Sequence, residues 1–294
     1  MSGAISESVL LTKNVLSLTT KNSNQILFEC GRAAYTTARS VMQTNVFQMT
    51  NHVNRLYTAI AGLFPEEQKS LNITKEEIRN TMISNVRKAR DYLCEKNPAI
   101  AADKLNVKFS VIIEKPSKED RLPMTILIAP MSKPHNPPIV CDVYHVIRHN
   151  AVVKDSKWVI ERDQYYKKSG KGVEDILLCE NDCMYEGGQS NFFAVKNGTV
   201  YTRGDGVLQG TMRSMVLTLC EKLNIPVCLE SPRLSEISQW DACFLTSTSR
   251  CVMNINTVRE DGKILKEFVG ENKVVKEIVA AVENELILQS EPVF

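Results

Sequence analysis

A proline-rich segment in the middle of the chain constrains the fold more than any other feature of the sequence. Residues 133–138 read Lys-Pro-His-Asn-Pro-Pro, which can continue neither a helix nor a central strand. The length of 294 residues also exceeds the usual size of one domain. We therefore predict an N-terminal domain over residues 1–140, a C-terminal domain over 149–294, and a connection over 141–148.

Helix and strand signals are interleaved in the N-terminal half. Apolar residues recur at three- and four-residue spacing over 52–64, which predicts a helix. A second helix is predicted from the capping box that begins at Thr74 to the Asn97-Pro98 pair, because proline disfavours helical backbone in the residue before it. We expect strands at residues 10–18, 25–28, 108–114 and 124–129, and one more at 139–147.

The C-terminal half carries more strand signals. Asn197-Gly198 separates two apolar runs and predicts a hairpin with strands at 191–195 and 199–202. A helix is expected over 211–223, and a longer amphipathic helix over 266–288. Because neither half shows a strict strand–helix–strand rhythm, we predict the α+β class in two domains. Further strands are expected at 175–179, 227–229 and 242–245, with another hairpin at Asp261-Gly262.

Composition and charge exclude several classes of protein. Lys and Arg number 36 against 34 Asp and Glu, so the net charge of +2 lacks the basic excess of a sequence-independent nucleic-acid binder. No run of 18 apolar residues is present, so we expect no transmembrane helix and no membrane partner. The nine cysteines and four histidines show no metal-ligand spacing, and we predict no metal site.

The cysteines and the first residues bear on the cellular compartment. An odd number of cysteines in a chain of this size is typical of free thiols in a reducing compartment. Residues 1–22 are rich in Ser and Thr, but they lack the apolar core of a secretory signal and the arginines of a mitochondrial presequence. We expect a cytoplasmic protein, with a mitochondrial one as the alternative.

Two segments of the C-terminal half could bind an anion. Gly204, Gly206 and Gly210 precede the predicted helix start at Thr211, where backbone N–H groups and the helix dipole favour phosphate. The hydroxyl run over 246–249 follows an apolar strand and could also contact phosphate oxygens. Each pattern alone is also typical of an ordinary turn, and a nucleotide-phosphate binding module is one alternative.

Two charged residues could act on a cofactor. Glu186 stands between a polar turn and an apolar strand, so its carboxylate is either held at a strand end or solvated in a surface turn. Lys154 follows Val152 and Val153, and burial of its amine would lower its pKa and make it a nucleophile toward carbonyl groups. A surface lysine is the simpler interpretation of Lys154 taken alone.

The order of these features along the chain resembles one family. A lysine, a Glu-Gly segment, a Gly-Thr-x-Arg helix start and a hydroxyl run follow one another as in the class IV (fold-type IV) pyridoxal-phosphate enzymes. This family includes branched-chain and D-amino-acid aminotransferases and aminodeoxychorismate lyase. Residues 35–39 (Tyr-Thr-Thr-Ala-Arg) and 52–56 (His-Val-Asn-Arg-Leu) resemble its N-terminal signature. The resemblance spans residues 30–255 and is close to uncharacterised eukaryotic members.

The resemblance carries expectations for the fold and the assembly. It implies a small N-terminal domain that resembles an α/β sandwich, and a larger C-terminal domain that resembles a β-barrel with helices. It also implies a homodimer and pyridoxal 5'-phosphate as the cofactor.

The resemblance also assigns a role to each candidate residue. Lys154 is similar to the family's Schiff-base lysine because it lies four residues before Trp158, whereas the rival Lys157 directly precedes that tryptophan. Glu186 matches the carboxylate that faces the pyridine nitrogen, where an anion keeps the nitrogen protonated. Phosphate contacts are implied for Arg55, for the N–H groups of Thr211 and Met212, and for Thr248 with its neighbour Ser247.

The implied activity is that of an aminotransferase, which moves an amino group between an amino acid and a 2-oxo acid. Substrate contacts are expected from Tyr35, Thr37 and Arg39, where the two domains of such enzymes meet. Two alternatives use the same cofactor. One is a lyase of the aminodeoxychorismate type, which releases pyruvate, and the other is a family member that binds the cofactor with little turnover.

Three departures from the branched-chain pattern leave the substrate open. Val159 stands where the branched-chain members usually carry tyrosine. Residues 32–34 (Arg-Ala-Ala) replace Gly-Asp-Gly, and Met253-Asn254 replaces Pro-Val. The residues that match the cofactor side of the family are complete, whereas those on the substrate side are not those of a branched-chain enzyme.

Overall fold

The computed structural model describes residues 8–97, 105–131 and 138–294, which form two compact units. Unit 1 comprises Met1–Lys133, Val153–Ile160 and Leu286–Phe294, and unit 2 comprises Pro134–Val152 and Glu161–Glu285. The sequence predicts two continuous domains, whereas each unit is built from separate segments. Of the proline-rich segment at the expected boundary, residues 133–137 lie outside the described residues.

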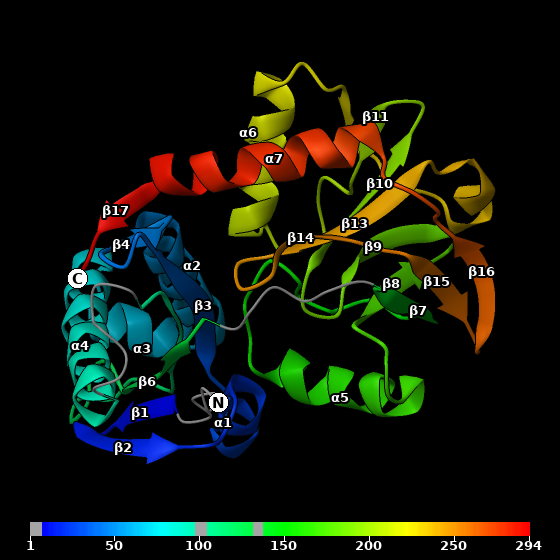
Figure 1. The fold of residues 1–294 in the computed structure, drawn as a ribbon. Helices are drawn as coiled ribbons and strands as arrows, with labels where there is room; N and C mark the ends of the chain where they lie inside the picture. The colour runs from blue at the N-terminus through cyan, green and yellow to red at the C-terminus, as the bar shows by residue number, and fades with distance from the viewer. Residues whose placement is uncertain (1–7, 98–104, 132–137) are drawn as a thin grey trace. The chain divides into compact units, whose positions relative to one another are not determined.

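Unit 1 is a seven-stranded sheet with helices packed on it (Figure 1). The strand order is β17-β4-β3-β5-β6-β1-β2, and α2 contacts β3 while α4 contacts β1 and β6. The strands are β1 (Ser8–Thr12), β2 (Val15–Thr19), β3 (Ala34–Val41), β4 (Asn45–Phe47), β5 (Val107–Ile113), β6 (Met124–Pro130) and β17 (Ser290–Pro292). The helices are α1 (Ser23–Glu29), α2 (Met49–Leu63), α3 (Pro65–Ser70) and α4 (Lys75–Lys96).

An apolar cluster between the helices and the sheet stabilises unit 1. Leu56 and Ile60 of α2 are fully buried in it together with Met82 and Val86 of α4 and Ile126 of β6. Their spacing in each helix is the one that predicted these helices from the sequence. Burial of each such side chain contributes about 1.5–3 kcal/mol to stability.

Two of the predicted strands near the N-terminus differ from the structure. Residues 25–28 belong to α1 and not to a strand, because Asn22 and Gln25 form a reciprocal capping box with bonds of 3.0 and 2.8 Å. The expected strand at 10–18 is a hairpin of β1 and β2 instead. Lys13 and Asn14 have positive φ values of 48° and 61° at its turn.

Unit 2 contains a ten-stranded sheet. Eight strands follow the order β12-β11-β10-β9-β8-β7-β15-β16, while β13 pairs with β10 and β14. The strands are β7 (Val140–His145), β8 (Asp175–Glu180), β9 (Cys183–Gly187), β10 (Asn191–Lys196), β11 (Thr199–Tyr201), β12 (Val227–Cys228), β13 (Ala242–Ser247), β14 (Cys251–Asn254), β15 (Thr257–Glu260) and β16 (Lys263–Glu267). The helices within unit 2 are α6 (Thr211–Lys222) and the 3-10 helix η2 (Leu234–Gln239), whereas α5 (Lys157–Ser169) and α7 (Lys273–Leu288) each have residues in both units.

The hairpins of unit 2 lie where the sequence predicts them. Asn197 and Gly198 have φ values of 51° and 73° between β10 and β11, and Asp261 and Gly262 have 46° and 77° between β15 and β16. The last helix begins at Lys273, later than predicted, because the chain before it forms β16. Helix α5 was not predicted. The α+β class is confirmed.

None of the helices within the described residues has the length and apolar character that a membrane-spanning segment requires.

Replacement of Thr74 by Ala is expected to destabilise the start of α4 by about 1 kcal/mol. The reason is that Thr74 Oγ1 accepts a hydrogen bond from Glu77 N at 3.1 Å, which satisfies one N–H group of the first turn. Hydrogen exchange of the amides in that turn measures the effect. The control is Thr74→Ser, which keeps the oxygen, and equal exchange rates in the two variants would contradict the capping role.

Candidate functional site

The backbone around Lys154 is held by the start of β3. Tyr35 N donates to Lys154 O at 3.1 Å, and Ser156 N donates to Ala33 O at 2.9 Å. Ser156 Oγ in turn accepts a hydrogen bond from Ala33 N at 2.9 Å. The position of the Lys154 backbone within unit 1 is therefore set by a strand and not by a mobile loop.

The three residues that depart from the family's Gly-Asp-Gly pattern support this same segment. Arg32 donates from Nε and Nη2 to Asp155 Oδ2 at 3.0 and 2.9 Å. Ala33 and Ala34 are fully buried, and Ala34 forms a β-bridge with Asp155. Their small side chains let the two backbones approach closely, so the departure has a structural role beside Lys154.

The side chains of the two rival lysines lie in different surroundings. Lys154 is half-buried, and its Nζ lies 4.7 Å from the centroid of the Tyr35 ring, within the range of a cation–π contact. Lys157 is exposed at the start of α5, where its backbone N–H donates to Asp155 Oδ1 at 2.9 Å. The surroundings favour Lys154 as the functional lysine, and its role stays a prediction.

Arg55 belongs to a polar group in unit 1 that includes a fully buried histidine. His52 and Arg55 are three residues apart on α2 and thus share one face of the helix. Thr36 Oγ1 lies 2.8 Å from His52 Nδ1 and 3.5 Å from Arg55 Nη1. Burial, and then the charges of Arg55 and Lys154, hold the pKa of His52 well below its ordinary value. His52 and Thr36 had no assigned role in the sequence-based prediction.

The three predicted substrate residues lie at alternate positions of β3. Tyr35, Thr37 and Arg39 therefore share one face of the strand, opposite to the face of Thr36. Thr37 Oγ1 is 3.1 Å from Ser110 Oγ on β5. Arg39 pairs in register with Lys108, which gives this face of the sheet two neighbouring cations, and their part in substrate binding stays a prediction.

Glu186 is held in unit 2 with only 4% of its surface exposed. Its Oε2 accepts a hydrogen bond from Leu208 N at 3.1 Å, and Arg148 Nη1 lies 3.9 Å from its Oε1. A buried carboxylate requires such partners to remain ionised. The structure thus excludes the solvated surface turn. Arg148 could not be found from the sequence because no motif marks it.

Helix α6 offers backbone donors beside two hydroxyl groups. Its N-cap is Gly210, which provides no side-chain cap for the N–H groups of the first turn. Thr211 Oγ1 is 2.8 Å from Thr248 Oγ1, so the helix start lies next to the hydroxyl run, and the phosphate contacts that the resemblance implies for both stay a prediction. Ser247 is engaged elsewhere, since its Oγ accepts from Arg250 Nε at 3.2 Å. Met212 is buried.

A partly buried ion-pair network surrounds the buried carboxylate of Asp175 in unit 2. Arg250 donates to Asp175 Oδ2 at 2.9 Å and to Glu174 Oε1 at 2.8 Å. Ser190 Oγ, in the loop after Glu186, donates to the same Asp175 oxygen at 2.7 Å. Arg250 and Asp175 thereby connect the hydroxyl run at the end of β13 to the loop between β9 and β10, and neither residue was singled out from the sequence.

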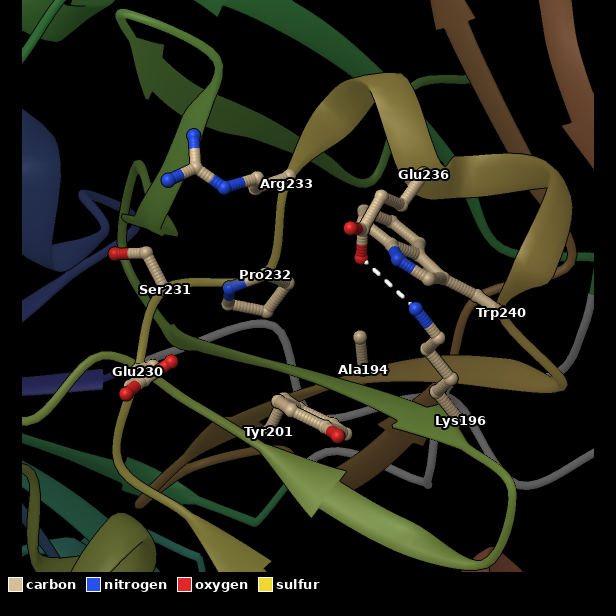
Figure 2. Close-up of a pocket in the computed structure, with 9 residues that line it drawn as sticks. All are labelled: Ala194, Lys196, Tyr201, Glu230, Ser231, Pro232, Arg233, Glu236 and Trp240. Carbon is tan, nitrogen blue, oxygen red and sulfur yellow. Dashed lines mark hydrogen bonds and ion pairs between the residues drawn. The ribbon is translucent and has the colours of Figure 1, made fainter.

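A pocket of about 230 Å³ in unit 2 is lined by other residues (Figure 2). Lys196 and Glu236 form an ion pair of 3.0 Å across it, next to Tyr201 and Trp240. None of the catalytic, cofactor-binding or substrate-binding residues predicted from the sequence lines this pocket. Because Lys196 and Glu236 neutralise each other's charge, the pocket is not assigned to the candidate site.

Gly210→Ala is expected to destabilise unit 2 by about 1–3 kcal/mol, because an added Cβ would clash with Asn191 Oδ1. The backbone of Gly210 has φ −68°, so the close approach and not the conformation requires glycine. Asn191→Ala alone loses a 2.7 Å bond to Leu208 O. In a double-mutant cycle followed by thermal unfolding, the double variant should lose less stability than the sum of the two single variants. Additive losses would refute the clash.

Comparison with known sequences identifies the family. The profile described as "Amino-transferase class IV" matches residues 33–258. The "Probable branched-chain-amino-acid aminotransferase" of Rickettsia typhi is 33% identical over 139 residues, which cover 42% of this chain and 47% of that protein. The match thus spans less than half the length of this curated relative.

Two solved structures share the fold over nearly the whole chain. The branched-chain aminotransferase of Thermoproteus uzoniensis with norvaline has a TM-score of 0.66 at 19% identity and covers 98% of this chain and 100% of its own. A branched-chain aminotransferase from T.th., complexed with N-(5'-phosphopyridoxyl)-L-glutamate, has a TM-score of 0.70 at 13% identity, with 99% and 100% coverage. The predicted fold type is confirmed. Because the profile match spans most of the sequence, the chain belongs to the class IV aminotransferase family.

Proposed function

We propose that the protein is a pyridoxal 5'-phosphate-dependent aminotransferase that moves an amino group between an amino acid and a 2-oxo acid. The family match over residues 33–258 carries this proposal, because it contains every candidate residue from Tyr35 to Thr248. The names of the matched relatives and the phosphopyridoxyl compound in one structural neighbour support it.

The residues of unit 2 fit the chemistry of this cofactor. The uncapped N-terminus of α6 and the hydroxyl groups of Thr211 and Thr248 are suitable donors to a phosphate group. The buried carboxylate of Glu186 is a suitable partner for a protonated pyridine nitrogen. Pyridoxal phosphate, when bound, supplies an electron sink for negative charge at the Cα of an amino acid.

The chain's own groups would carry out the remaining steps. We assign covalent attachment of the cofactor and transfer of the Cα proton to Nζ of Lys154, which is the only one of the two rival lysines that is half-buried. Glu186 would hold a proton on the pyridine nitrogen by its charge. The resemblance assigns phosphate contacts both to Arg55 and to the start of α6, and a phosphate held there would orient the ring for proton transfer at Lys154.

The expected partners are small molecules, namely an amino acid and a 2-oxo acid. Family resemblance supports a homodimer, and multi-angle light scattering of the purified protein measures the oligomeric state directly. A cytoplasmic location is proposed from the free cysteines of the sequence, with a mitochondrial one as the alternative. A monomer would remove the dimer from the proposal without affecting the cofactor chemistry assigned to Lys154.

The decisive measurement is an absorption spectrum of the purified protein, recorded with pyridoxal phosphate and then with L-glutamate. We expect a visible band from the covalent cofactor that decays as glutamate donates its amino group. A band that ignores all amino donors would favour the lyase or the binding protein with little turnover. Absence of a band in the presence of the cofactor would refute the proposal.

Lys154→Ala should abolish the visible band, because the variant has no amine at the assigned position. Lys157→Ala is the matched control, since it removes a lysine three residues away that is exposed, and it should keep the band. The absorption spectra of the two variants decide between the rivals. The opposite pattern would transfer the assignment to Lys157.

Glu186→Gln should retain the cofactor and lower turnover by roughly a hundredfold or more, because loss of the carboxylate charge removes electrostatic stabilisation of the reacting state. The measurement is kcat with the amino donor that the absorption experiment identifies. Glu180→Gln, in the neighbouring strand of the same hairpin, should keep full activity. Unchanged turnover in Glu186→Gln would exclude a role for this carboxylate at the pyridine nitrogen.

A further inference from the structure

We propose that His52 is a positioning residue that orients Arg55 through the hydroxyl group of Thr36. The inference rests on the proposed function, in which Arg55 binds the phosphate of the cofactor. It adds two residues from inside unit 1 that set the direction of the phosphate-binding guanidinium.

The distances define a short chain of polar groups. Arg55 Nη1 lies 3.5 Å from Thr36 Oγ1, at the long end of the hydrogen-bonding range, and Thr36 Oγ1 lies 2.8 Å from His52 Nδ1. A guanidinium can only donate, so Thr36 Oγ1 accepts from Arg55. The hydroxyl proton of Thr36 is then available to His52, and Nδ1 accepts it when the neutral imidazole carries its own proton on Nε2.

This direction of the hydrogen bonds requires an unprotonated Nδ1. His52 is fully buried, and the cationic Arg55 and Lys154 face it from α2 and from the segment before α5. Burial and both charges disfavour the imidazolium form. An imidazolium, or a neutral imidazole with its proton on Nδ1, would donate to Thr36 Oγ1 and would leave the hydroxyl proton of Thr36 without this acceptor.

The burial of His52 is difficult to explain by packing alone. Its Nε2 has no hydrogen-bond partner within the described part of the chain, although the atom is buried. A buried polar atom without a partner costs about 1–3 kcal/mol, whereas an apolar side chain would fill the same place without that cost. The hydrogen bond between His52 Nδ1 and Thr36 is therefore the contact that an apolar residue at position 52 could not replace.

Orientation matters for Arg55 because its side chain is long and flexible. A guanidinium that already donates a hydrogen bond from one N–H loses less rotamer entropy on binding a phosphate than one that is free to move. Thr36 is also the neighbour of Tyr35, whose ring lies against Lys154 Nζ. The same two residues of β3 thus set the surroundings of both the lysine and the arginine.

The experiment compares pyridoxal phosphate with pyridoxal, which lacks the phosphate group. Dissociation constants of both are measured by absorption for the wild-type chain and for Thr36→Val, Thr36→Ser and Ser40→Ala. Thr36→Val removes the hydroxyl with little change in shape, and Thr36→Ser restores it. Ser40 is the matched control, because its buried hydroxyl on the same strand bonds to Asn106 and Val107 instead.

We expect Thr36→Val to raise the dissociation constant of pyridoxal phosphate about tenfold, which is typical for the loss of a hydrogen bond to a charged group. The dissociation constant of pyridoxal should hardly change. Thr36→Ser should recover most of the affinity, and Ser40→Ala should leave the ratio of the two dissociation constants unchanged even if it lowers the melting temperature. Equal weakening of both compounds in Thr36→Val, or no rescue by serine, overturns the inference.

A second measurement requires no variant. In the wild-type protein, the ¹⁵N resonance of His52 Nδ1 should be that of an unprotonated acceptor near neutral pH, and a protonated Nδ1 overturns the proposal. The two levels of inference remain distinguishable. A wild-type chain that binds no pyridoxal phosphate refutes the proposed function, whereas binding with an unchanged ratio in Thr36→Val refutes only the role of His52 and Thr36.

Discussion

Backbone pairing between residues 33–35 and 154–156 is the constraint on which the surroundings of Lys154 depend. Ala33 and Ser156 are 123 positions apart in the sequence, yet they exchange hydrogen bonds of 2.9 Å. Closure of so long a loop has an entropic cost, which the buried contacts and hydrogen bonds of this pairing offset. Once it is formed, Tyr35 and Lys154 are neighbours, and the face of β3 that carries Thr36 meets His52 and Arg55 of α2.

In unit 2, polar groups and one close contact hold together segments that are far apart in the sequence. Asp175 accepts hydrogen bonds from Arg250 and Ser190, so the turn after β13 and the loop before β10 are held to the first residue of β8. Gly210 and Asn191 approach so closely that a side chain at position 210 would require the Asn191 side chain to shift. These contacts keep Glu186 and the start of α6 in defined positions within the unit.

The elements that the sequence predicted correctly have signals that lie within a few residues of one another. Asn197-Gly198 forms a tight hairpin because both residues adopt positive φ, and Thr74 begins α4 because its hydroxyl caps the first turn. The prediction of a strand at 25–28 was wrong, although the signal for a helix there is also local. The apolar run was interpreted as a strand, and the capping box of Asn22 and Gln25 just before it was not considered. The late start of α7 also has a local cause, because residues 263–267 pair with β15 across the hairpin at Asp261-Gly262 and are not available to the helix.

Part of the candidate site could be predicted from the sequence, and the assignments of its residues stay predictions. The sequence by itself determined the order of the lysine, the acid, the helix start and the hydroxyl run, and through that order the family and the fold type. It also determined the small residues, Ala33, Ala34 and Gly210, that permit close approach of the chain.

Only the tertiary structure decided which groups are partners. It paired Arg148 with Glu186, Arg250 with Asp175, and His52 with Thr36. The physical reason is that the strength of a charge pair or a hydrogen bond depends on distance and burial, and side chains far apart along the chain acquire both only when the strands and helices that carry them have packed.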